Sequence, residues 1–364
     1  MELIRIFHPI GQGAFYTEQH DFNGTKFTIV YDCGSTTFKE KNMEKRIKSS
    51  FPKNCQIDIL FISHFHEDHV SGIEILAKHC KIKKVVMPLI DDEAKILLKV
   101  TNLIESKSSD TRLIDNPEIF FGETIPIIKI KPTEINSDAD NVSLDNPVNI
   151  SEFNNSGDKP SGTVFVPTAG VDWYFIPFNY KHNERKKQFE IALAKHHLTL
   201  NEIDTIKKIK SNKSKIINAY EAVDGDLNKN SMILFSGKNK NDQIQCFEHP
   251  YYCCFHSNFH LTIHSGCLYM GDIDLNEPNI VTDIKAKLRS LFLFIGTLQI
   301  PHHGSIHNFT SSILQSGIHC AIFSYGTTNT YGHPSDSVIS DIITNNIYPH
   351  LVTGEQISMV TQWK

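Results

Sequence analysis

The stretch that decides the fold runs from residue 58 to residue 70 and reads DILFISHFHEDHV. Its first half, Ile59 to Ile62, is an apolar run with the length of a buried strand. Four side chains that can bind metal ions follow within six residues: His64, His66, Asp68 and His69. In extended backbone the side chains repeat every two residues, so His64 and His66 are expected to point the same way and bind one ion.

Asp68 and His69 would then open a helix and face a second ion. A mixture of imidazole and carboxylate suits Zn²⁺, Mn²⁺ or Fe²⁺ better than Ca²⁺ or Mg²⁺. A polar surface turn with accidental histidines is the alternative, and it is disfavoured because partner residues follow other strands.

The surrounding sequence alternates strands and helices. Residues 26–31 form an apolar strand that leads into Asp32-Cys33-Gly34, where Gly34 can adopt a positive φ. Apolar residues at helical spacing follow the histidine motif, residues 84–88 form another strand, and Asp91 can cap a helix that extends to about residue 107. This rhythm predicts an α/β fold.

The composition is typical of a globular protein, and the charge and cysteine pattern limit the class of protein it can be. The 364 residues are 40% hydrophobic and 21% charged, with a formal net charge of −5, which argues against a protein that coats nucleic acid. We expect no targeting segment and no membrane span. The eight cysteines form no C-x-x-C pair, so we expect reduced thiols and a cytoplasmic location. Cys253-Cys254 is interpreted as buried packing rather than as a metal or redox pair.

Four further residues follow expected strands or tight turns and can complete a metal site: Asp272, His302, His303 and His333. A carboxylate at Asp272 could bridge two ions. Either His302 or His303 can complete the second site, and we favour His303, which leaves His302 either to support a ligand from behind or to contact the substrate. His333 lies in Gly332-His333-Pro334 and could act as a general acid, or it could be an ordinary surface histidine.

These residues resemble the metallo-β-lactamase fold, through His64-x-His66-x-Asp68-His69. A narrower resemblance is to the hydrolase domain of ComEC-like DNA-uptake proteins and their soluble relatives. It rests on the ordered set Gly11-Gln12-Gly13, Asp32-x-Gly34, Asn230-Ser231, Gly271-Asp272, Pro301-His302-His303-Gly304-Ser305 and Gly332-His333-Pro334. The resemblance covers most of residues 1–90 and 225–364, and Ala14 departs from it.

The resemblance implies an αββα sandwich with metals at the sheet edge, and phosphodiester or nucleic-acid hydrolysis. Residues 1–100 and 225–364 would form the hydrolase domain, with 101–224 as a partly helical, basic insertion or cap. From Lys181 to Lys215, ten Lys and Arg residues stand against four Asp and Glu residues, which suits either a polyanionic substrate or a solvated helix face. A third histidine for the first ion is not evident; His182, His260 and His264 are candidates, and an open position filled by water or substrate is the alternative.

Two divalent ions, Zn²⁺ or Mn²⁺, would lower the pKa of a bridging water and produce a hydroxide nucleophile. Asp68 would be both ligand and catalytic residue, His302 or His333 would stabilise the departing alkoxide, and Asp32 would fix a ligand histidine from behind. Two alternatives stay open. One is a hydrolase of thioesters, lactones or β-lactams, and the other is a metal-bound sensor or scaffold in a multi-protein, defence-type system, with the insertion as the partner surface.

Overall fold

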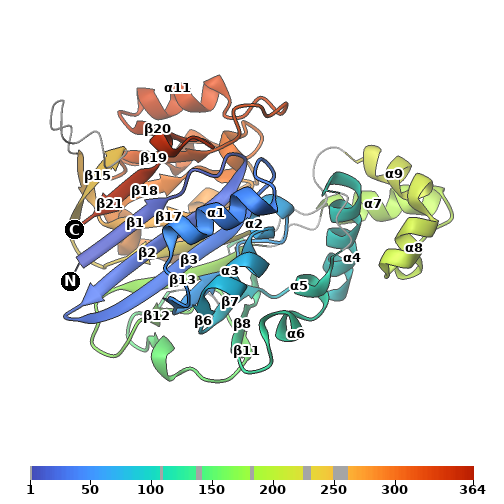
Figure 1. The fold of residues 1–364 in the computed structure, drawn as a ribbon. Helices are drawn as coiled ribbons and strands as arrows, with labels where there is room; N and C mark the ends of the chain where they lie inside the picture. The colour runs from blue at the N-terminus through green and yellow to red at the C-terminus, as the bar shows by residue number, and fades with distance from the viewer. Residues whose placement is uncertain (1, 107–109, 137–141, 181–183, 224–230, 249–260) are drawn as a thin grey trace.

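The structure is a computed structural model of the chain, and it describes residues 2–106, 110–136, 142–180, 184–223, 231–248 and 261–364. Two large β-sheets pack face to face, with helices on the outer face of each (Figure 1). The predicted α/β class and the αββα sandwich are therefore confirmed. The residues His182, Asn230, Cys253, Cys254 and His260, named above, lie outside the described residues.

The first sheet contains ten strands. In spatial order they are β11 (Gly157–Lys159), β8 (Ile127–Ile130), β7 (Val85–Pro88), β5 (Ile59–Phe61), β3 (Thr25–Ser35), β2 (Gly13–Phe22), β1 (Glu2–Phe7), β21 (Val360–Trp363), β15 (Gln243–Glu248) and β16 (Leu261–His264). The run β3–β5–β7–β8 is parallel, whereas β1, β2, β21 and β15 pair antiparallel.

The second sheet contains nine strands. Eight follow the order β10 (Val148–Asn149), β12 (Phe165–Val166), β13 (Tyr174–Tyr180), β14 (Ser231–Gly237), β17 (Gly266–Tyr269), β18 (Ile295–Gln299), β19 (Cys320–Ser324) and β20 (Tyr348–Val352), and β9 (Pro132–Thr133) pairs with β13. From β17 to β20 the strands are parallel. A short separate ladder joins β4 (Gln56–Ile57) to β6 (Lys81–Ile82).

The apolar run before the histidine motif is buried on both faces. Ile59 and Phe61 contribute to the core between the sheets, whereas Leu60 and Ile62 contribute to the core beneath helices of the first sheet. Alternate residues of a strand point to opposite faces, so only a sheet covered on both sides makes such a run favourable. The histidines that follow the run therefore lie at the C-terminal end of a central parallel strand, β5.

Helices cover both outer faces. Over the first sheet lie α1 (Glu40–Ser50), α2 (Glu67–Val70) and α3 (Ile73–His79), and the second is covered by α10 (Ile280–Leu288) and α11 (Asp336–Thr344). Two short helices, α5 (Arg112–Asp115) and α6 (Pro117–Phe121), follow the first group along the chain. None of the helices among the described residues is long and apolar enough to cross a membrane.

A helical lobe projects from the sandwich (Figure 1). It contains α4 (Asp92–Thr101), α7 (Glu184–Lys195), α8 (Ile206–Ser211) and α9 (Lys213–Glu221), which share a hydrophobic core of their own. Residues 101–224, which were expected to form an insertion, are thus divided between the sandwich and the lobe. Strands β8 to β13 pair into the two sheets of the sandwich, and α7 to α9 form the lobe together with α4. That this lobe acts as a cap stays a prediction.

Candidate metal centre

One edge of the sandwich collects polar side chains from both sheets. His64 and His66 follow β5, Asp272 follows β17, and the short helical turn Pro301–Gly304 follows β18. Carboxyl ends of parallel strands meet at the same edge of a sheet, which explains why segments distant in sequence converge here. Two groups of ligand atoms form, each within 4.8 Å: one from His64, His66 and Asp272, the other from Asp68, His69, Asp272 and His303.

Asp272 belongs to both groups. Its Oδ2 atom lies 3.4 Å from Nε2 of His64, and its Oδ1 atom lies 3.2 Å from Nε2 of His69. The residue before it, Gly271, has a φ of +52°, and a Cβ there would lie 2.3 Å from Oγ of Ser231. Only glycine fits this turn, so the carboxylate is fixed between the two groups.

His303 enters the second group, whereas His302 lies beside it. Nε2 of His303 is 2.8 Å from Oδ2 of Asp68, and its Nδ1 is 2.7 Å from the carbonyl oxygen of Ser324. Both histidines adopt a left-handed backbone, with φ of 46° and 56°, which turns successive rings in different directions. His302 uses its Nδ1 to contact Oδ1 of Asn308 at 2.8 Å.

Asp32 is buried directly behind the histidine motif. Its carboxylate accepts hydrogen bonds from the backbone N–H and the hydroxyl of Ser63, at 2.7 and 2.6 Å, and from Nδ1 of His69 at 2.8 Å. Ser63 in turn lies 2.8 Å from Nδ1 of His64. The position expected for Asp32, behind a candidate ligand histidine, is the position the structure gives it.

The glycine after Asp32 has a different role from the one expected. Asp32 itself has the positive φ, of 56°, and Gly34 does not lie in the left-handed region. A Cβ on Gly34 would lie 2.4 Å from the backbone nitrogen of Val70 and 2.5 Å from the carbonyl carbon of His69. Gly34 therefore does not use the positive φ that glycine can adopt. Its lack of a side chain instead allows the backbone of α2 to approach β3, and this contact positions His69.

These contacts fix where three histidines carry their protons. Nδ1 of His69 faces the Asp32 carboxylate, and Nδ1 of His303 faces the carbonyl oxygen of Ser324. Nδ1 of His64 faces Oγ of Ser63, and because Ser63 donates its hydroxyl proton to Asp32, this oxygen accepts from His64. Each Nδ1 is thus a donor. In their neutral forms all three rings direct an Nε2 lone pair at the carboxylates of Asp68 and Asp272, and such a contact is favourable only with a proton or a metal ion between the two atoms.

The charges around the site also favour a bound cation. Burial opposes ionisation of His69, yet the carboxylates of Asp272, Asp68 and Asp32 hold its pKa well above the usual range. Burial would likewise raise the pKa of Asp272, but His69, His302 and His64 lower it well below the usual value. The carboxylates of Asp32, Asp68 and Asp272 thus place negative charge around these imidazoles, and a set of nitrogen and carboxylate donors suits divalent ions of the Zn²⁺ or Mn²⁺ type.

His333 lies on the outer side of this cluster. Its ring centroid is 5.3 Å from that of His302 and 6.5 Å from that of His303. Burial, and then the neighbouring His302, lower the pKa of His333 to about 4, so the ring is neutral near pH 7. Its buried Nδ1 has no hydrogen-bond partner within the described part of the chain. That atom can therefore bind a group that enters the site.

The structure brings together the predicted residues His64, His66, Asp68, His69, Asp272 and His303, with Asp32 behind them and His302 and His333 beside them. His264, a candidate third ligand, lies elsewhere: it is the last residue of β16, and its backbone lies against Gly296 near the start of β18. The roles of the residues in this cluster as ligands or catalytic groups stay predictions.

Two positioning residues were missed. Ser63 links Asp32 to His64, and Asn308 accepts from His302 while donating to the backbone of Asp272 at 3.1 Å. Ser63 is adjacent to the motif, so its place at the end of a buried strand was a usable signal. Asn308 offered none, because its contact with Asp272 joins two segments that are 36 residues apart.

The chain is similar to known proteins in part of its sequence. Residues 22–141 match the family model described as the metallo-beta-lactamase superfamily. A crystal structure of MEM-A1, a subclass B3 metallo-beta-lactamase isolated from a soil metagenome library, matches with 12% sequence identity and a TM-score of 0.32, over 86% of this chain and 82% of that chain. No curated protein matches the sequence.

Proposed function

From a chain that carries a metallo-beta-lactamase superfamily domain, we propose a dinuclear metal-dependent hydrolase that cleaves phosphodiesters, as a phosphodiesterase or nuclease. The observation that carries this proposal is the position of Asp272 between two groups of ligand atoms, opposite Nε2 lone pairs of His64 and His69. When bound, two divalent ions would supply Lewis-acid activation of a water and of the scissile phosphoryl group.

The residues of the chain divide the remaining work. His64, His66 and Asp272 would hold one ion, and Asp68, His69, Asp272 and His303 would hold the other. Asp32 and Ser63 keep the rings of His69 and His64 oriented, with Nδ1 toward the protein and Nε2 toward the candidate metal positions. Asp68, which contacts His303, would also orient the nucleophile.

His333 is better suited than His302 to contact the leaving group. Neutral His302 has its proton on Nδ1, where Asn308 accepts it, so only its doubly protonated form could donate from Nε2. In contrast, Nδ1 of His333 is buried and has no partner among the described residues. We therefore assign to His333 a hydrogen bond to a phosphoryl or alkoxide oxygen, and to His302 the placement of the substrate.

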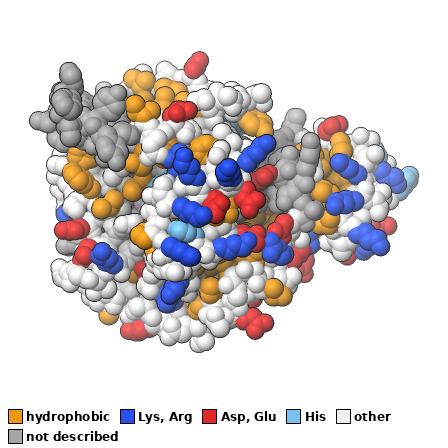
Figure 2. All heavy atoms as spheres, viewed as in Figure 1, with side chains coloured by type: hydrophobic (Ala, Val, Ile, Leu, Met, Phe, Trp, Pro, Cys, Tyr) orange, Lys and Arg blue, Asp and Glu red, His pale blue; other side chains and the backbone are white. Residues whose placement is uncertain are grey.

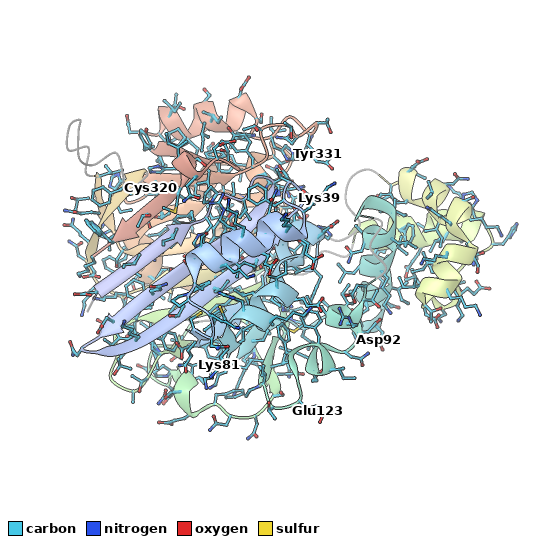
Figure 3. The ribbon with its side chains drawn as sticks, in the orientation of Figure 1. Lys39, Lys81, Asp92, Glu123, Cys320 and Tyr331 are labelled. Atoms are coloured by element: carbon cyan, nitrogen blue, oxygen red, sulfur yellow. The ribbon has the colours of Figure 1, made fainter. Side chains whose placement is uncertain are left out.

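The approach to the centre has features suited to a nucleotide. Tyr331 is 72% exposed and its ring centroid is 5.9 Å from that of His333. Figure 3 places Tyr331 on the side of the sandwich toward the helical lobe. The lobe displays several Lys and Arg side chains in Figure 2, which would attract a polyanion. An aromatic ring beside the site could stack on a base.

Hydrolysis of bis(p-nitrophenyl) phosphate tests the proposal. Metal-stripped protein would be refilled with Zn²⁺ or Mn²⁺ and assayed beside Asp68→Ala and, as a matched control, Asp172→Asn, which changes a half-buried carboxylate outside both groups of ligand atoms. Turnover that depends on metal and is lost in Asp68→Ala supports phosphodiester chemistry. Absence of turnover with either metal, in protein shown to be folded and loaded, contradicts it and directs the search to thioesters, lactones and protein partners.

A further inference from the structure

A second cluster of ligand atoms lies inside the sandwich. Cys246 belongs to β15 of the first sheet, whereas Cys320 and His350 belong to β19 and β20 of the second. Their Sγ and imidazole nitrogen atoms lie within 4.8 Å of one another, and all three side chains are buried. Cys320 opens β19, whose last residue is Ser324, and Figure 3 shows Cys320 on the side of the sandwich away from the lobe.

The spacing fits one tetrahedral or trigonal ion. With metal–sulfur bonds of about 2.3 Å and metal–nitrogen bonds of about 2.0 Å, neighbouring S and N ligand atoms lie about 3.5 Å apart at tetrahedral angles. Sγ of Cys246 lies 3.5 Å from Nε2 of His350. This pair is therefore already at the separation that coordination requires, and the Sγ atom of Cys320 lies within 4.8 Å of both atoms.

A neighbouring amide holds the Cys246 sulfur in place. Nε2 of Gln362 donates to Sγ of Cys246 at 3.5 Å and to Oγ1 of Thr297 at 2.8 Å. Oε1 of the same amide accepts from Nη1 of Arg5 at 2.9 Å, which fixes the orientation of the amide group. An N–H directed at sulfur stabilises a thiolate, and such outer contacts commonly orient metal ligands.

Packing alone explains part of this arrangement. A buried cysteine often behaves as a small apolar side chain, and the surrounding core includes Ile244, Ile322 and Val352. It does not explain why a buried imidazole from β20 meets two thiols from different sheets, with a fixed amide donor behind one of them.

We propose that Cys246, Cys320 and His350 bind a thiophilic d¹⁰ ion, Zn²⁺ or Cu⁺, which ties the two sheets together. Binding would release two thiol protons to solvent, and His350 would coordinate as a neutral imidazole through Nε2. The sulfur-rich donor set separates this site from the nitrogen and carboxylate centre around Asp272, because soft thiolates select Zn²⁺ and Cu⁺. Both sheets would then be fixed by one ion, so loading should raise the melting temperature.

Cobalt spectroscopy of the whole protein tests the site without relying on any activity. Co²⁺ bound by thiolate gives an intense near-ultraviolet charge-transfer band, which a site of nitrogen and oxygen ligands does not give. The wild-type protein should show this band, and it should be lost in Cys246→Ser and in Cys320→Ser. The band should persist in Asp68→Ala, in Cys267→Ser, which alters another buried thiol, and in Cys253→Ser/Cys254→Ser.

Competition then distinguishes the two ions: Zn²⁺ should bleach the cobalt band, and Cu⁺ under anaerobic conditions should bleach it with its own affinity. The wild-type measurement decides even if a serine variant fails to fold. No charge-transfer band in the reduced wild-type protein overturns the proposal. A band that survives both cysteine substitutions, or a Cys246–Cys320 disulfide found by mass spectrometry in freshly reduced and desalted protein, overturns it as well.

Discussion

Oδ2 of Asp32 lies 2.8 Å from Nδ1 of His69, whose Nε2 atom faces Asp272 3.2 Å away. The Asp32 carboxylate therefore holds the Nδ1 side of the His69 ring, which leaves Nε2 facing Asp272. The same carboxylate accepts two hydrogen bonds from Ser63, and the hydroxyl of Ser63 contacts His64. Asp32 thus orients candidate ligands of both groups without belonging to either group.

Replacement of Asp32 by Asn should weaken metal binding without removing a ligand. Three donors meet the carboxylate, and an amide offers one oxygen and an N–H₂ group that must face a donor. We expect affinity for Zn²⁺ to fall about 10- to 100-fold, the usual cost of losing such a contact. Chelator competition measures it against Asp172→Asn, and equal affinities would refute the orienting role of Asp32.

Gly34→Ala should destabilise the protein and disturb the same centre. The added Cβ would lie 2.4 to 2.5 Å from backbone atoms of Val70 and His69, which cannot move without shifting α2. Overpacking of this kind typically costs about 1–3 kcal/mol. Urea unfolding would measure the loss beside Gly157→Ala, where a Cβ meets nothing within 4 Å. Similar stabilities of the two variants would contradict the close contact between β3 and α2.

A buried ion pair between the sheets should make stability dependent on acid. Nε of Arg5 donates to Oε1 of Glu18 at 2.7 Å, and both side chains are fully buried. Tyr269 and Ser236 donate to the same carboxylate, at 2.8 and 2.7 Å. Burial alone would raise the pKa of Glu18, but Arg5 and then His20 lower it far below the usual value.

Because the folded pKa of Glu18 lies below the unfolded value of about 4.3, its contribution is complete above that pH and is lost as pH falls below it. Glu18→Gln should remove this dependence and leave Arg5 without a counter-ion, at a cost of about 3–5 kcal/mol near pH 7. Unfolding free energies at pH 7 and pH 3.5 would show the gap between wild type and variant narrowing in acid. A constant gap would exclude this ion pair as the cause.

The sequence predicted the parts of the centre that local rules govern. His64 to His69 follow an apolar strand, and Asp272 and His303 each follow another, so strand ends could be recognised one at a time. Asn308 could not be found in this way, because its contact with Asp272 spans 36 residues and depends on how two loops meet. The thiol and imidazole of Cys246 and His350, 104 residues apart, likewise meet only through the packing of two sheets.

The place of residues 127–180 in the sandwich was hidden for another reason. Strands such as β9, β10 and β12 contain two residues each, too few to show an alternating pattern. Their positions follow from neighbours that pair with them, β13 above all. The helical lobe was easier to recognise, because α7 and α9 repeat apolar residues at helical spacing and bury them against α4.

Charge reversal on the lobe tests whether it contributes to substrate binding. The basic residues Lys207, Lys208 and Lys210 belong to α8, and Ile209 between them is buried in the lobe core, so the lysines can be changed without altering that core. Lys207→Glu/Lys210→Glu should weaken binding of a single-stranded oligonucleotide to catalytically inactive Asp68→Ala protein and reduce the slope of log affinity against log salt by about 1 or more. Hydrolysis of bis(p-nitrophenyl) phosphate should not change, because that substrate is too small to reach the lobe. An unchanged salt slope would instead assign these lysines to a solvated face or to a protein partner.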